Sequence, residues 1–331
     1  MAVRRRKQRR GRSYAWRYRG RIVACVFVEV LIICALGIMV GWNKGVKEWF
    51  EQFEQPVLKE VDISGINSPN AILMHARGGK VLGEINGDEK IYPASMTKIM
   101  TVILGIENFD DLDEKITLTD EMFAGLYEQD ATQAGFQPGE EVRVIDLLYG
   151  AMLPSGAECC IALADTISGS EADFAELMNK KAAKLGMDNT HFCDSTGLHN
   201  PDHYSTVKDI AVLMKYCIKN DTFREIVETS RHSTGVTNIH PDGITYYSTM
   251  FKNLSDPTVT GGKILGGKTG YTSEAGHCLV SFAEIEGREY IFVSAGASGA
   301  DGNTIPHIQD AVTVYNRVGA AIEAKMNDNN K

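Results

Sequence analysis

Two side chains three residues apart carry the first sign of chemistry in this sequence. Ser95 and Lys98 stand in the segment 93–98 (PASMTK), which opens the apolar run 99–106. Positions i and i+3 of a helix lie on one face, about 5–6 Å apart at Cβ, so a hydroxyl and an amine placed there can exchange a proton. This spacing allows a serine nucleophile that is activated by a lysine base.

The same spacing occurs again at Ser205 and Lys208, so the motif alone proves nothing. An S-x-x-K match is expected roughly once by chance in a chain of this length. At the second copy, Thr206 and Asp209 fit a helix N-cap followed three residues later by an acid, ahead of the apolar run 210–216. We therefore interpret the second copy as a helix cap.

Lys98 lacks such a structural explanation. No acid follows Ser95 at the matching place, and Lys98 falls in the first turn of its helix, where a cation opposes the helix dipole. That placement lowers the pKa of the amine, which suits a general base better than a stabilising residue. Two later segments supply partners in order along the chain, namely Ser155-Gly156-Ala157 and Lys268-Thr269-Gly270.

The elements that must position these residues are partly strands and partly helices. The segments 71–75 and 80–85 predict a β-hairpin, because the Gly-Gly pair at 78–79 permits positive φ in the turn. Helices are predicted over 99–106, 146–153, 157–167, 174–185, 210–216 and 308–324, and strands over 115–119, 263–268, 278–285 and 290–295. Strands and helices that are segregated in this way predict an α+β domain.

The ordered set of S-x-x-K, a second element with serine, and K-T-G occurs in penicillin-binding proteins and class A β-lactamases. From about Ile66 to Arg317 the chain resembles the D-alanyl-D-alanine carboxypeptidases, which are low-molecular-mass penicillin-binding proteins of peptidase family S11. The matching segments are 92–101 (YPASMTKIMT), 153–156 (LPSG), 196–198 (TGL), 203–206 (HYST) with Asp209, and 267–272 (GKTGYT). The resemblance implies a β-lactamase/transpeptidase-like fold, with an antiparallel sheet flanked by helices and an inserted helical lobe.

The resemblance also implies a reaction. Ser95 attacks the carbonyl between two D-alanines and forms an acyl-enzyme, Lys98 is the general base, and Ser155 relays a proton to the leaving amine. The implied function is removal of the terminal D-alanine from peptidoglycan stem pentapeptides. The expected partners are the D-Ala-D-Ala terminus of the stem peptide and β-lactam antibiotics, penicillins among them. No metal and no cofactor are expected.

Four further residues would bind the substrate if the resemblance holds. Lys268 and Thr269 hold the terminal carboxylate, which selects for a free C-terminus. Gly270 continues this segment, and the backbone N–H groups of Tyr271 and Ser95 form the oxyanion hole. The loss of one such donor typically costs about 10²–10³ in rate.

The second element departs from the family's usual pattern. Asn usually stands at the position of Ala157, which is followed here by Glu158. The missing amide contact is worth about 1–3 kcal/mol, and Glu158 is one candidate to replace it. Two alternatives to the carboxypeptidase follow. One is a membrane-anchored protein that binds penicillin or peptidoglycan with weak turnover, and the other is a serine β-lactamase. The sequence shows no convincing Glu element for the fast deacylation that a β-lactamase requires.

The N-terminal sixty residues predict a membrane anchor. Residues 1–21 hold ten basic and no acidic residues, whereas the whole chain has 34 basic and 43 acidic residues. The apolar stretch 22–42 contains one charge, Glu29, and as a helix spans about 31 Å, close to the hydrocarbon thickness of a bilayer. The basic block favours a cytoplasmic N-terminus. We therefore expect a single-pass protein of the cell membrane whose catalytic domain is extracytoplasmic.

The expected organisation is a basic tail (1–21), a transmembrane helix (22–42), a stalk (43–60), a catalytic domain (61–325) and a polar tail (326–331). Within the catalytic domain we expect a sheet lobe (61–90 and 260–325) and a helical lobe (about 95–235). A cleaved signal peptide is the alternative for the N-terminus, but apolar residues continue beyond the weak cleavage candidate at 35–37. The acidic body argues against a nucleic-acid partner. A metallopeptidase site at His199, Asp202 and His203 is disfavoured, because Pro201 prevents a regular helix there.

Overall fold

A six-stranded antiparallel sheet forms the centre of the fold in the computed structural model, which describes residues 58–254, 256–299 and 305–329. These residues belong to one compact unit, Val57–Lys331. The strand order is β2-β1-β10-β9-β8-β7. The strands are β1 (Asn70–His75), β2 (Val81–Ile85), β7 (Thr258–Val259), β8 (Gly262–Thr272), β9 (Gly276–Ile285) and β10 (Arg288–Ala297). The α+β class, the N-terminal hairpin and the C-terminal strands are therefore confirmed.

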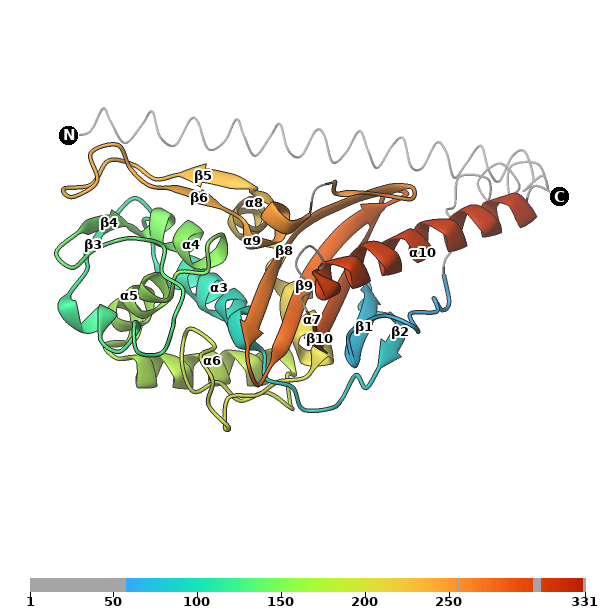
Figure 1. Cartoon of the computed structure of the whole chain (residues 1–331), viewed down its shortest axis with the longest axis horizontal. Coiled ribbons are helices and arrows are strands. Elements are labelled where there is room, and N and C mark those ends of the chain that lie inside the picture. The colour runs from blue at the N-terminus through green and yellow to red at the C-terminus, as the bar shows by residue number, and fades with distance from the viewer. Residues whose placement is uncertain (1–57, 255, 300–304, 330–331) are drawn as a thin grey trace, which may run out of the picture. The chain divides into compact units, whose positions relative to one another are not determined.

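Helices cover both faces of this sheet (Figure 1). α10 (Pro306–Asn329) packs on one face against β9 and β10, while α7 (Val207–Cys217) and α8 (Asp221–Glu228) pack on the other face against β1, β8 and β10. The helices between β2 and α7 are α3 (Lys98–Asn108), α4 (Val144–Met152), α5 (Ala157–Ser168) and α6 (Glu171–Leu185), preceded by the 3₁₀ turn η1 (Ala94–Thr97). α3 begins at Lys98, and Ser155 lies in the connection between α4 and α5.

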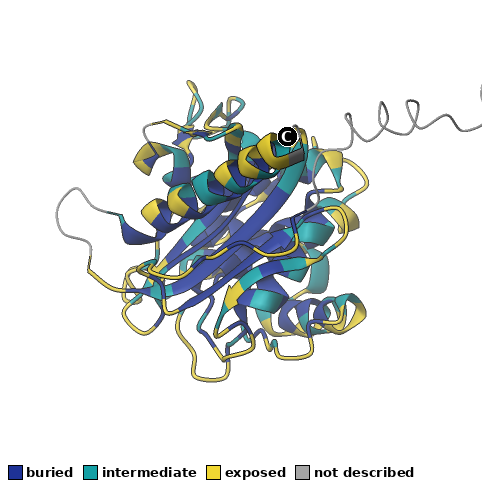
Figure 2. Cartoon of the chain, turned by 90° about the vertical axis from the view of Figure 1, so that its right-hand side faces the viewer, coloured by how far each residue is buried: buried dark blue, intermediate teal, exposed yellow. Residues whose placement is uncertain are grey.

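The alternation of side chains along β9 explains why the sheet supports two cores. Val280 and Phe282 point into the core shared with the helices α3 to α8. Leu279 and Ala283 point to the opposite face and pack in the core beneath α10. All four side chains are fully buried, and Figure 2 shows the strands as a buried layer behind α10. Successive residues of a strand face opposite sides, so a sheet covered on both faces is apolar at nearly every position.

Several short elements were missing from the sequence-based prediction. These are β4 (Glu141–Arg143), which pairs with β3 (Lys115–Thr117), the ribbon β5 (Arg231–Ser233) with β6 (Thr245–Tyr247), the edge strand β7, the turn η2 (Asp120–Phe123), α8 and α9 (Thr249–Asn253). The predicted anchor and most of the stalk lie outside the described residues. Within residues 58–254, 256–299 and 305–329, no helix is both long and apolar enough to cross a bilayer.

The interpretation of the second S-x-x-K copy as a helix cap is confirmed. Thr206 is the N-cap of α7, and its hydroxyl accepts a hydrogen bond of 3.0 Å from the backbone N–H of Asp209. Lys208 forms an ion pair with Asp88 at 2.9 Å instead of approaching Ser205. We expect Thr206→Ala to lower the free energy of unfolding by about 1 kcal/mol, the usual value of a lost cap. Urea denaturation measures this loss, and an unchanged midpoint would contradict the cap.

Candidate active site

The turn that carries Ser95 has an unusual backbone. Ala94, directly before Ser95, has a φ of +47°, a left-handed conformation that costs a non-glycine residue energy. η1 then passes directly into α3, so that Lys98 is the first residue of the α-helix. Helical geometry brings the two side chains together as their spacing predicts. Lys98 Nζ donates a hydrogen bond of 3.0 Å to Ser95 Oγ.

Ser155 also approaches Ser95, although 60 positions separate them in sequence. Its Oγ donates a hydrogen bond of 3.0 Å to Ser95 Oγ. Ser155 has a φ of +74° in the short connection between α4 and α5, and Gly156 is the N-cap of α5. Two strained non-glycine residues, Ala94 and Ser155, therefore flank one hydroxyl, a pattern that is common where side chains are held for chemistry.

The amine of Lys98 is enclosed by the protein. Only 4% of the residue is exposed, and Nζ donates a second hydrogen bond, of 2.7 Å, to the carbonyl oxygen of Thr196. Burial lowers the pKa of Lys98, while the negative charges of Asp194 and Glu158 partly oppose this shift. The lowered pKa agrees with the direction expected from the sequence, and burial is its largest cause. A buried amine with a lowered pKa is more often neutral and can accept a proton.

Lys268 is the second buried amine near Ser95. It lies in β8, is 1% exposed and donates a hydrogen bond of 2.9 Å to the carbonyl oxygen of Thr269. Burial lowers the pKa of Lys268 strongly, and the charge of Lys98 lowers it further. The two amines thus disfavour each other's protonation. An anion that bound between them would relieve this repulsion.

The remaining predicted residues of β8 pass close to the Ser95 turn. A Cβ at Gly270 would lie 2.9 Å from the backbone nitrogen of Ser95, which is too close for any side chain. Glycine at this position therefore lets strand and turn approach each other. Thr269 Oγ1 lies 2.7 Å from Thr249 Oγ1 of α9. Tyr271 is 62% exposed, and its ring contacts His277 at a centroid distance of 4.6 Å.

Ala157 is buried at the start of α5, where its backbone N–H donates to the carbonyl oxygen of Thr132. The neighbouring Glu158 binds a loop: its Oε1 accepts hydrogen bonds from the backbone N–H groups of Ala134 (2.6 Å) and Gly135 (2.9 Å). Its Oε2 has no hydrogen-bond partner among the described residues, and burial raises the pKa of Glu158. The carboxylate is therefore engaged with the loop at 134–135, and no hydrogen bond joins it to Ser95 or Lys98.

Three residues that support this site have no role predicted from the sequence. Thr196 supplies a backbone carbonyl to Lys98, and Asp194 with His203 holds the same loop. The segments 196–198 and 203–206 were part of the resemblance, but a backbone acceptor leaves no signature in a sequence. His203 bonds to Asp194 and Thr97, and the described residues contain no cluster of three or more side chains suited to a metal. The five cysteines in the described part of the chain are free thiols.

A Ser–Lys–Ser centre between a helical region and the K-T-G strand of an antiparallel sheet defines the class of active-site-serine DD-peptidases. The comparisons with known proteins identify the family within this class. The family described as D-alanyl-D-alanine carboxypeptidase, peptidase S11, matches residues 57–299. The chain belongs to this family.

Similar proteins come from several bacteria. The D-alanyl-D-alanine carboxypeptidase DacF of Bacillus subtilis (strain 168) is 36% identical over 69% of this chain and 57% of its own length, and DacC of Escherichia coli (strain K12) is 35% identical over 72% and 58%. The chain thus spans somewhat more than half of these two relatives. A crystal structure of the Streptomyces K15 DD-transpeptidase superimposes with a TM-score of 0.69 at 30% identity, covering 79% of this chain and 100% of that one.

Proposed function

We propose that this protein is a serine-type D-alanyl-D-alanine carboxypeptidase that removes the terminal D-alanine from peptidoglycan stem pentapeptides and is acylated by penicillins. The observation that carries the proposal is the position of Ser95 Oγ, which lies 3.0 Å from both Lys98 Nζ and Ser155 Oγ. The names of the relatives support the choice of substrate.

The acylation step follows from this geometry. Neutral Lys98 accepts the proton of Ser95 Oγ across the 3.0 Å contact as the oxygen attacks the carbonyl carbon of the penultimate D-alanine. The negative charge that develops on the carbonyl oxygen is stabilised by the backbone N–H groups of Ser95 and Tyr271. The proton then passes from Lys98, by way of the Ser155 hydroxyl, to the nitrogen of the leaving D-alanine, and an ester on Ser95 remains.

The substrate's carboxylate belongs beside β8. Lys268 and Thr269 supply an ammonium and a hydroxyl there, and the carboxylate would stabilise the protonated form of Lys268, whose pKa burial lowers in the free protein. Substrate binding thereby keeps Lys268 protonated. The repulsion between the two neighbouring amines then favours neutral Lys98. In the second half of the reaction water attacks the ester carbonyl carbon and gives a proton to Lys98, and Lys98 returns that proton to Ser95 Oγ as the bond to the shortened peptide breaks.

The test is release of D-alanine. The full chain is incubated with a pentapeptide that ends in D-Ala-D-Ala, and the products are followed by mass spectrometry. The proposal expects one D-alanine and one tetrapeptide per turnover, and no cleavage of the same peptide when its C-terminus is amidated. Cleavage of the amidated peptide at the same rate would contradict the role of Lys268 and Thr269.

A second candidate function rests on Ala157, which stands where the family usually has Asn. In this candidate the protein is acylated by penicillin or bound by stem peptide but turns over slowly. We expect Ala157→Asn to raise D-alanine release by up to about 10-fold, the rate equivalent of one recovered hydrogen bond. Equal turnover in both proteins, measured in the pentapeptide assay, would show that the missing amide does not limit the rate. Rapid hydrolysis of penicillin by the unaltered protein would instead favour a serine β-lactamase.

The proposal includes the location of the protein in the cell. The basic block 1–21 followed by the apolar stretch 22–42 supports a single-pass anchor with the catalytic part outside the cytoplasm. The stem peptide is extracytoplasmic, which agrees with this orientation. Protease digestion of intact and of permeabilised cells tests it: the catalytic part should be accessible as soon as the wall and any outer membrane are breached.

A further inference from the structure

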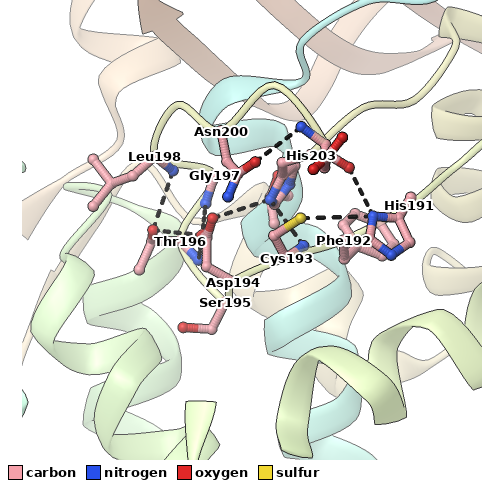
Figure 3. Close-up of polar contacts among 12 residues, drawn as sticks. His191, Phe192, Cys193, Asp194, Ser195, Thr196, Gly197, Leu198, Asn200 and His203 are labelled. Carbon is pink, nitrogen blue, oxygen red and sulfur yellow. Dashed lines mark hydrogen bonds and ion pairs between the residues drawn. The ribbon is translucent and has the colours of Figure 1, made fainter. Parts of the chain in front are cut away.

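A half-buried acid, Asp194, and a buried histidine, His203, form a pair in the loop that follows α6 (Figure 3). Asp194 Oδ2 lies 3.0 Å from His203 Nδ1, and His203 is 2% exposed. Burial alone would raise the pKa of Asp194, but the hydrogen bonds and the charge of His203, together with hydrogen bonds from Thr196, lower it to about 2. Asp194 is therefore ionised at neutral pH.

Asp194 is linked to Lys98 through the loop 194–197. Asp194 Oδ1 accepts three hydrogen bonds, from the backbone N–H of Thr196 (2.7 Å), from Thr196 Oγ1 (2.7 Å) and from the backbone N–H of Gly197 (2.6 Å). These bonds fix the peptide groups on both sides of Thr196. Its carbonyl oxygen is the acceptor for Lys98 Nζ at 2.7 Å.

His203 is linked by a separate contact to the turn that carries Ser95. His203 Nε2 lies 2.9 Å from Thr97 Oγ1, and Thr97 is the residue between Met96 and Lys98. A chain of contacts thus runs from the amine of Lys98 through Thr196, Asp194 and His203 back to the residue adjacent to Lys98. Every side chain in this circuit belongs to a residue that is buried or half-buried.

We propose that Asp194 and His203 are positioning residues that hold Lys98 as the base for Ser95, Asp194 through the Thr196 carbonyl and His203 through Thr97. The inference rests on the proposed function, because it takes Lys98 as the base. Neither residue touches the reacting atoms. Their effect is to fix the direction of the amine and the turn that carries Ser95, so that substrate meets a base already in place.

Asp194 also acts on Lys98 by its charge. Its carboxylate stabilises protonated Lys98 and so raises the pKa of that amine against the larger effect of burial. The other titratable groups that face Lys98 are Glu158, Cys159 and Cys160 of α5 and Lys268 of β8. Removing the charge of Asp194 should therefore lower the pKa of Lys98. Because only neutral Lys98 accepts a proton, the acylation rate of a variant without the Asp194 charge should begin to rise at a lower pH than that of the unaltered protein.

The test compares Asp194→Asn with the unaltered full chain, using the rate of acylation by a fluorescent penicillin from pH 5 to pH 10. We expect Asp194→Asn to acylate more slowly at its pH plateau, by up to about 10²-fold, because a small misplacement of a reacting group has effects of this size. We also expect the acid limb of the rate profile to move to lower pH. A plateau rate and an acid limb that both match the unaltered protein would overturn the inference.

The chain contains a control for the loss of an acid that pairs with a histidine. Asp146, which is 1% exposed at its side chain, pairs with His232 at 3.1 Å and with Arg143 at 2.8 Å, and it forms no hydrogen bond with Ser95 or Lys98. Asp146→Asn should lower the unfolding midpoint in urea and leave the acid limb unmoved. A shift of the acid limb in Asp146→Asn equal to that in Asp194→Asn would contradict a specific action of Asp194.

A second variant covers the case in which Asp194→Asn does not fold. Thr97→Val keeps the shape of the side chain but removes the contact with His203, and it leaves the Asp194 charge in place. We expect slower acylation with an unmoved acid limb. Acylation at the unaltered rate would exclude the positioning role of His203 through Thr97. If the unaltered protein is not acylated at all, the proposed function fails first, so the two failures are distinguishable.

Discussion

Replacing Lys98 by Met is expected to reduce the rate of acylation by penicillin by about 10²–10⁴-fold, the usual contribution of a general base. Met has a similar length but cannot accept the proton of Ser95. Because Lys98 is 4% exposed and burying an amine is costly, the variant should unfold at the same urea concentration as the unaltered protein, or at a higher one. Stopped-flow acylation and urea denaturation separate the two effects.

The second S-x-x-K copy provides the control for this prediction. Lys208 is 42% exposed at its side chain, pairs with Asp88 and ends the same kind of motif, which begins at Ser205. Lys208→Met should acylate at the unaltered rate, because a surface ion pair is worth only about 0–1 kcal/mol to stability and nothing to this chemistry. A loss of acylation in Lys208→Met, or its retention in Lys98→Met, would contradict the assignment of the base.

Gly197→Ala is expected to have the second large effect. Gly197 has a φ of +81°, and a Cβ there would overlap the carbonyl oxygen of Ala94, directly before Ser95. The loop 194–197 or the Ser95 turn must then move, and a displacement of about 1 Å at reacting groups costs on the order of 10²-fold in rate. The left-handed backbone should add a loss of about 1 kcal/mol or more in the free energy of unfolding.

Gly169 separates the two contributions, because it has the same φ of +81° and no atom within 4 Å of a built Cβ. Gly169→Ala should show the loss of stability without the loss of acylation. We would measure both variants by urea denaturation and by acylation rate in one series. If Gly197→Ala lost no more activity than Gly169→Ala, the close approach between loop and catalytic turn would not matter for the reaction.

The local part of the site was predictable, and the parts built by tertiary contacts were not. The contact between Ser95 and Lys98 follows from i, i+3 spacing, and the cap at Thr206 follows from its own sequence. Ser155 and Lys268 were found through the order of motifs along the chain, since spacing alone does not bring distant segments together. The Thr196 carbonyl was missed because any residue type offers a backbone oxygen. Asp194 and His203 were missed as a pair because only the fold joins them.

The same distinction holds for the secondary structure. The strands β9 and β10 and the helices α5, α6 and α7 were predicted within a few residues, because long apolar patterns identify buried elements. The three-residue strands β3 to β6 are too short to show a period, and only β3 was foreseen. β8 was predicted as a weak strand over 263–268 because of its glycines, yet it extends over Gly262–Thr272. The glycine at 270 has a packing role: because it lacks a side chain, the Ser95 turn can lie against the strand.

The measurement that tests the central claim most directly is the mass of the protein after exposure to penicillin. The account predicts that the full chain gains the mass of one penicillin, that peptide mapping places the adduct on Ser95, and that Ser95→Ala gains no mass. An adduct on any other residue, or an undiminished adduct in Ser95→Ala, would contradict the identification of Ser95 as the nucleophile and with it the proposed reaction.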